Sequence, residues 1–85
     1  MPKIIWSQTA SKDMARLEKG VAARIIEKIE TASKNTDHYF RRLAGFEEAK
    51  LRVGEYRVLA RLLCGGEIII IERVGHRKKI YKNID

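Results

Sequence analysis

The stretch VGHRKKIYK, residues 74–82, gathers positive charge beside the most hydrophobic part of the chain. It contains four cations and no carboxylate, and it follows closely on a run of four isoleucines. Arginine forks bind phosphate bidentately, and tyrosine or histidine rings can stack on an unpaired base. The combination indicates a binding site for a polyanion. The residues that would form it are His76, Arg77, Lys78, Lys79, Tyr81 and Lys82.

Composition narrows the class of partner and the compartment. A net charge of +7 on 85 residues favours a nucleic acid, although an acidic protein would also fit. A chain this short has little room for a second lobe, so we expect one domain over residues 1–85. Cys64, the single cysteine, argues against a disulfide framework and is expected to be a small buried hydrophobe. Without an apolar span or a signal-peptide pattern, we expect a cytoplasmic protein with no membrane partner.

The first half of the chain predicts a strand followed by two amphipathic helices. Residues 3–6, KIIW, are typical of a strand, and Ser7 suits the N-cap of the first helix. Gly20 is expected to end that helix, and the second helix is expected over residues 21–33. Because the connection is tight, the two helices should form an antiparallel hairpin. Their apolar stripes consist of Ala10, Met14, Leu17, Val21, Ile25, Ile29 and Ala32.

The second half of the chain predicts a β-meander. After a polar loop at residues 35–40, the hydrophobic period changes from 3.6 to 2. Strands are expected at residues 49–53, 56–63 and 68–74, joined by two tight turns that contain glycine. The last strand is apolar on both faces, which is typical of a strand near the centre of a sheet. The fold class is therefore α+β, with a helix hairpin packed on a small antiparallel sheet.

The strand alternation predicts that many of the cations share one face of the sheet. Side chains at positions i and i+2 of a strand lie on the same face. The helices need an apolar face to cover, so the basic residues between the apolar ones should point to the open face. The residues expected there are Lys50, Arg52, Arg57 and Arg61, joined by Arg73, His76 and Arg77 from the end of the last strand.

The residue types on this face suit metal-free cleavage of RNA by its own 2′-hydroxyl. Such a reaction needs a base, cations that stabilise the phosphorane, and a donor to the leaving oxygen. We find no sequence pattern of a nucleophile with its base, no phosphate-binding glycine loop and no zinc-ligand spacing. We therefore expect neither a metal nor a cofactor.

The stretch LAGFEEAKLRVGEYRVLARLLCGGEIIIIERVGHRKKIYK resembles the RelE/ParE toxin superfamily, and within it the RelE-type mRNA interferases. The similar features are LRVGEYRV, VGHR after the last strand, and a tyrosine four residues beyond that arginine. WSQTASKDMARL also resembles the opening strand and first helix of the family. The resemblance implies a toxin of a type II toxin–antitoxin pair that cleaves mRNA in the ribosomal A site. It implies a RelB-like antitoxin, the ribosome and mRNA as partners.

The resemblance also assigns roles to individual residues. Arg57 would bind the scissile phosphate, and Arg77 would stabilise the transition state and the leaving group. Tyr81 would stack on a base or share in proton transfer, and Lys50 matches one of the family's lysines. Glu48 stands where the best-known relatives carry another lysine. The general base could therefore be Lys50, Tyr81 or Glu48, or the activity could be weak.

A second group of residues is expected to contact RNA without taking part in the chemistry. His76 has two interpretations, because a histidine at a strand end either donates to phosphate or forms a structural hydrogen bond. The other members are general electrostatic contacts, namely Arg52, Arg61, Lys78 and Lys79.

Two other functions remain open. A ParE-type toxin shares the fold but inhibits DNA gyrase through protein contact, without catalytic residues. A non-catalytic RNA-binding or transcription-regulating module could use the same basic face. Cleavage of translated mRNA, detected by primer extension, separates the interferase from both, and a supercoiling assay identifies the gyrase inhibitor.

Overall fold

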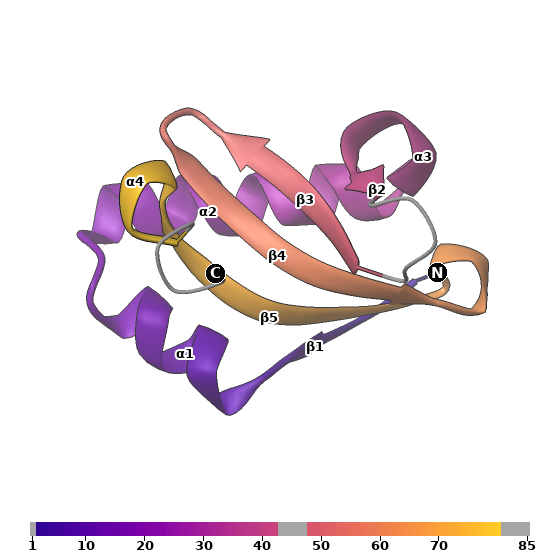
Figure 1. Ribbon diagram of the computed structural model, residues 1–85, viewed down its shortest axis with the longest axis horizontal. Helices are drawn as coiled ribbons and strands as arrows, with labels where there is room; N and C mark the ends of the chain where they lie inside the picture. Colours follow the sequence, from indigo (N-terminus) through magenta and orange to yellow (C-terminus); the bar gives the residue numbers. More distant parts are fainter. Residues whose placement is uncertain (1, 43–47, 81–85) are drawn as a thin grey trace.

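The computed structural model describes residues 2–42 and 48–80, with side chains up to residue 78, and it confirms the α+β class. Five strands form one sheet in the order β1-β5-β4-β3-β2 within this part of the chain, and α2 crosses behind the sheet (Figure 1). The elements are β1 Lys3–Trp6, α1 Gln8–Ala15, α2 Lys19–Ser33, α3 Thr36–Tyr39, β2 Arg41–Arg42, β3 Glu48–Val53, β4 Tyr56–Leu63, a 3-10 turn Cys64–Gly66, β5 Ile68–His76 and α4 Arg77–Ile80.

The predicted meander of β3, β4 and β5 is confirmed, and β1 adds to it in parallel. The sheet is therefore mixed, with β5 between β1 and β4. Ser7 forms the corner between β1 and α1. Its hydroxyl accepts from the Ala10 N–H at 3.0 Å, as expected of an N-cap, and donates to the Glu72 carbonyl at 3.0 Å. The N-cap thus also attaches the start of α1 to β5.

The core lies on one face of the sheet, under α1 and α2. Ala10 of α1 and the buried residues of α2 share a single hydrophobic cluster with alternate residues of the strands. α1 packs chiefly against β5, whereas α2 packs against β3. The buried strand residues are Ala49, Leu51, Val58, Ala60, Leu62, Ile69, Ile71 and Val74.

The prediction that Gly20 ends the first helix is wrong. α1 ends at Ala15, where the N–H groups of Arg16 and Leu17 donate to carbonyls three residues back. These shorter bonds close the last turn of the helix. Gly20 lies in the first turn of α2, which begins at Lys19.

The expected polar loop at residues 35–40 contains the short helix α3. Its end is aromatic, and Phe40 is only 4% exposed because it joins the core. Tyr39 packs against the same core and lies under the Lys28 ammonium, 4.8 Å from the ring centroid. Burial of these two rings orders a segment whose polar residues had indicated a loop.

The expectation that Cys64 is buried is also wrong. Cys64 is exposed and has a φ of 53°, at the start of the tight turn between β4 and β5. The left-handed backbone of this turn directs the side chain to solvent instead of continuing the strand alternation. Gly66 follows with a φ of 92°, and a Cβ there would lie 2.6 Å from Thr36 Oγ1, so the turn packs closely on α3.

Candidate functional site

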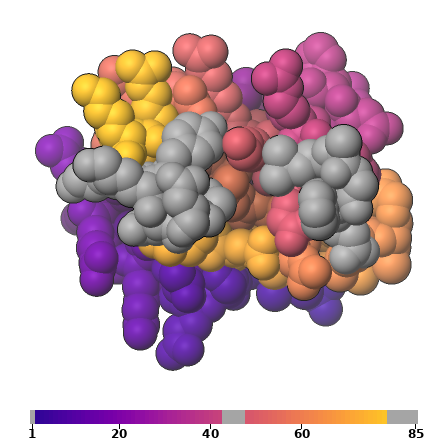
Figure 2. All heavy atoms as spheres, viewed as in Figure 1, coloured from indigo at the N-terminus to yellow at the C-terminus, as the bar shows by residue number. Residues whose placement is uncertain are grey.

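The face of the sheet opposite α2 carries Lys50, Arg52, Arg57 and Arg61, which we call the basic face. The register pairs Leu51 with Val58 on the core side, so the residues flanking these two point the other way. This face is turned towards the viewer in Figure 2, with α1 below it and α4 above. The alternation thus places the four predicted strand cations on one surface, as expected.

The cations on this face are densest near the turn between β3 and β4. Arg52 lies opposite Arg57, which in turn lies opposite Gly75 of β5. Gly75 adds no side chain to this row, so the two arginines supply all the side chains of these three paired positions. Like charges directly opposite on neighbouring strands repel each other. An anion bound between them would relieve that repulsion.

The next row contains a cation that the sequence reasoning missed. Lys50 lies opposite Leu59 on β4 and opposite Arg41 on β2. Arg41 is exposed and follows the buried Phe40 directly. The sequence signal that could have revealed it is the pair of adjacent arginines, Arg41 and Arg42, directly after the predicted loop at residues 35–40.

Arg61 lies further from this cluster and has a carboxylate as its cross-strand partner. It is half-buried and lies opposite Glu48 on β3. Opposite charges in this arrangement attract, so this end of the basic face has less net positive charge. Glu48 and Lys50 lie two residues apart on the same face, and both remain candidates for the base.

The guanidinium of Arg57 is held by the turn beside it. Its Nη1 donates to the carbonyls of Gly54 and Tyr56 at 3.0 and 2.9 Å. Gly54 has a φ of 60°. The tight turn between β3 and β4 requires this positive φ, which glycine adopts without strain. One nitrogen therefore fixes the side chain, while a guanidinium has further N–H groups that can bind an anion.

Arg77 is exposed and begins α4, next to the same turn. Its backbone N–H donates to the Glu55 carbonyl at 2.8 Å, which continues the pairing of β4 with β5. This bond places the backbone of Arg77 beside the turn, at the border of the basic face. Lys78 is also exposed. Tyr81 and the side chain of Lys79 lie outside the described residues.

His76 is not on the basic face, in contrast to the expectation. It pairs with Tyr56 and follows Val74, so it lies on the side of the sheet that holds the core. Its ring meets the Tyr56 ring edge-on, with centroids 5.7 Å apart and an interplanar angle of 78°. The other strand residues of the predicted RNA contact group, Arg52 and Arg61, point the opposite way.

Arg73 lies on the open face, as expected, because it pairs with Leu59 and precedes the buried Val74, and its guanidinium is fixed at the sheet edge. Its Nε donates to Asp13 Oδ2 of α1 at 3.0 Å, and the same oxygen accepts the Val74 N–H at 2.9 Å. Asp13 is 11% exposed, against 34% for Arg73. β1 no longer pairs with β5 here, so Asp13 satisfies a backbone donor that the sheet leaves open.

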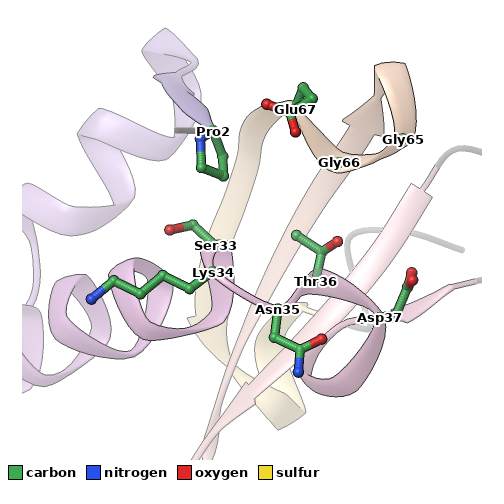
Figure 3. Close-up of a pocket in the computed structure, with 9 residues that line it drawn as sticks. All are labelled: Pro2, Ser33, Lys34, Asn35, Thr36, Asp37, Gly65, Gly66 and Glu67. Atoms are coloured by element: carbon green, nitrogen blue, oxygen red, sulfur yellow. The ribbon is translucent and has the colours of Figure 1, made fainter.

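Three further features of the described chain bear on other kinds of site. No group of histidine, cysteine or acidic residues in residues 2–42 and 48–80 could hold a metal ion. No helix within these ranges is long and apolar enough to cross a membrane. A polar cavity of about 310 Å³ lies between the end of α2, α3 and the turn between β4 and β5 (Figure 3). It is at the far end of β4 from Arg57, and none of the predicted site residues lines it.

Comparison with known proteins shows the family of this chain. Residues 4–81 match the family described as the ParE toxin of the type II toxin–antitoxin system parDE. No match was found among curated protein sequences.

Solved structures show the same fold. The RelB–RelE antitoxin–toxin complex from Methanococcus jannaschii is similar with 26% identity and a TM-score of 0.73, covering 95% of this chain and 99% of that one. The toxin–antitoxin complex RelBE2 from Mycobacterium tuberculosis has 25% identity and a TM-score of 0.77, covering 91% and 100%. The isolated RelE toxin of E. coli has 15% identity and a TM-score of 0.74, covering 98% and 94%.

Proposed function

We propose that this chain, which belongs to the ParE toxin family of type II toxin–antitoxin systems, inhibits translation as a ribosome-dependent, metal-independent endoribonuclease. The observation that carries the proposal is the cluster beside the turn between β3 and β4. There the fold brings Lys50 and Arg57 to one face and starts α4 with Arg77 at its border. A gyrase inhibitor that acts by protein contact alone has no need of such a cluster.

The proposed reaction is attack of an RNA 2′-hydroxyl oxygen on the adjacent phosphorus. The bond to the 5′-oxygen breaks, which leaves a 2′,3′-cyclic phosphate and a 5′-hydroxyl. Arg57 binds the phosphate oxygens with the N–H groups that the turn does not use, and Arg77 stabilises the charge that develops on the phosphorane and leaving oxygen. Lys50 or Glu48 on the basic face, or Tyr81, removes the 2′ proton, and the departing 5′-oxygen takes up a proton from solvent to become the 5′-hydroxyl.

A substitution at Lys78 tests whether this residue contributes to ribosome binding without taking part in cleavage. Lys78→Ala should weaken ribosome binding and reduce its salt dependence by about one counterion, because an exposed lysine acts as a phosphate contact. The cleavage rate on saturated ribosomes should stay within about twofold of wild type. The binding constant measured at several salt concentrations checks this, with the exposed Lys19→Ala on α2 as the control. A Lys78 variant that binds normally but cleaves slowly would place Lys78 in the chemistry instead.

A RelB-like antitoxin is the proposed partner of this chain, and the cytoplasm is the proposed location of the complex. The relatives from Methanococcus jannaschii and Mycobacterium tuberculosis were solved as complexes with antitoxins. A chain of net charge +7 is suited to an acidic, partly disordered partner that orders on binding.

Salt dependence tests this partnership. Association of the purified toxin with its co-expressed antitoxin should slow as salt rises, by about tenfold or more between low and high salt, because opposite charges steer the encounter. Stopped-flow association measures the rate. A rate independent of salt, or a toxin that is harmless and partnerless in its own cell, would contradict the proposal.

Inhibition of DNA gyrase is the second candidate function, and the match to the ParE toxin description favours it. A supercoiling assay with purified gyrase distinguishes the two. Inhibition at stoichiometric toxin, combined with intact mRNA on ribosomes, would select this function.

A further inference from the structure

His76 is fully engaged at the base of α4, although its residue type had suggested a phosphate contact. Its Nδ1 accepts the backbone N–H of Lys78 at 3.3 Å. Its Nε2 lies 3.5 Å from the Glu55 carboxylate, and its ring packs edge-on against Tyr56. Both nitrogens and the ring therefore face protein groups.

These contacts give His76 the geometry of a helix N-cap. The N–H of Lys78 belongs to the first turn of α4, where backbone donors have no partner within the helix. A side chain from the preceding residue that accepts such an N–H caps the helix. In a neutral imidazole one nitrogen accepts and the other donates. The Nδ1 that accepts from Lys78 thus leaves the proton on Nε2, next to Glu55.

The residue between His76 and Lys78 is Arg77. Its own N–H donates to the Glu55 carbonyl at 2.8 Å, so the backbone of Arg77 is held on both sides. Without the hydrogen bond from Lys78 to His76, the Arg77 N–H would still donate to Glu55. The backbone after Arg77 could then take several conformations. The cap therefore limits the directions in which the Arg77 guanidinium can point.

We propose that His76 is a positioning residue for Arg77, which it orients by capping α4, and that it does not contact RNA. The inference rests on the proposed cleavage reaction, in which Arg77 stabilises developing charge. Misplacement of such a group by about 1 Å reduces the rate strongly while binding stays unchanged. The expected defect is therefore in the rate on bound ribosomes and not in affinity.

Two substitutions separate the cap from the ring. His76→Asn places a carbonyl oxygen near the position of Nδ1 and removes the ring, whereas His76→Phe keeps the ring on Tyr56 and removes the acceptor. Single-turnover cleavage on saturated ribosomes should be about tenfold slower for Phe than for wild type, and at least fivefold faster for Asn than for Phe. Ribosome affinity should be equal for all three. The inference would be overturned if His76→Phe cleaved faster than His76→Asn, or if both variants bound ribosomes more weakly than wild type.

Amide exchange at Lys78 measures the cap independently of cleavage. The Lys78 N–H should exchange slowly in wild type and in His76→Asn, and about tenfold faster in His76→Phe. Equal exchange in all three proteins would refute the cap whatever the cleavage rates are. If the wild-type protein does not cleave mRNA but the amide exchange is as expected, the proposed function and the role of His76 in orienting Arg77 would be refuted. The capping of α4 by His76 would still be supported.

Discussion

Arg77→Ala is expected to lower single-turnover cleavage on saturated ribosomes by about 10²-fold or more. The substitution removes a charge-assisted contact that forms as charge develops on the phosphorane, and losses of this size are typical of such contacts. Stability should barely change, because the exposed side chain is replaced while the backbone bond to Glu55 remains.

Arg57→Ala should lower the single-turnover cleavage rate by a similar factor. A second substitution at this position tests whether the geometry of phosphate binding matters as well as the charge. Arg57→Lys keeps the positive charge but loses the fork that binds phosphate bidentately, so it should recover only part of the rate. Arg24→Ala on the exposed side of α2 is the matched control, since it removes one positive charge on the other side of the sheet. Wild-type rates for Arg57→Ala and Arg77→Ala together would refute a catalytic basic face.

Asp13→Ala should cause the largest loss of stability, about 2–3 kcal/mol. The substitution leaves the Arg73 guanidinium without its carboxylate and the Val74 N–H without an acceptor, in a site where Asp13 is 11% exposed. For a domain of this size the melting temperature should fall by roughly 10 °C or more. Urea unfolding followed by circular dichroism measures the free energy.

Asp37→Ala is the control for this loss. Asp37 forms the exposed pair with Arg42 at 4.0 Å and has a side chain that is 89% exposed. Solvent screens such a pair, so the free energy of unfolding should change by less than about 0.5 kcal/mol. Equal effects of the two substitutions would show that the contact of Asp13 with β5 does not hold α1 to the sheet.

The strands of the meander could be predicted from the sequence because their alternation is local. Residues 56–63 have an apolar side chain at every second position from Tyr56 on, and β4 has those bounds. The parallel pairing of β1 with β5 could not be predicted in the same way, because it joins residues 65 positions apart and leaves no periodic signal in either strand.

The errors share a physical cause, which is that tertiary contacts override local preference. Gly20 can end a helix, but here Leu17 and Val21 pack against the same core and α2 begins at Lys19. Phe40 is buried, which orders a polar segment, and Cys64 takes a left-handed turn conformation that exposes it.

The candidate site was predictable where it depends on alternation and not where it depends on distant partners. The side of the sheet that Lys50 and Arg57 face follows from the strand period. The partner of Arg73 is Asp13, 60 residues earlier, and the orientation of His76 depends on a bulge between β4 and β5 that shifts the register beside Leu59.

The most direct test of the central claim is analysis of the new RNA ends after purified protein acts on ribosomes with a defined codon in the A site. We expect a 2′,3′-cyclic phosphate on the upstream fragment and a 5′-hydroxyl on the downstream fragment, at one position, and only when ribosomes are present. Intact mRNA under these conditions, with wild-type protein that is folded and inhibits supercoiling by gyrase, would contradict it.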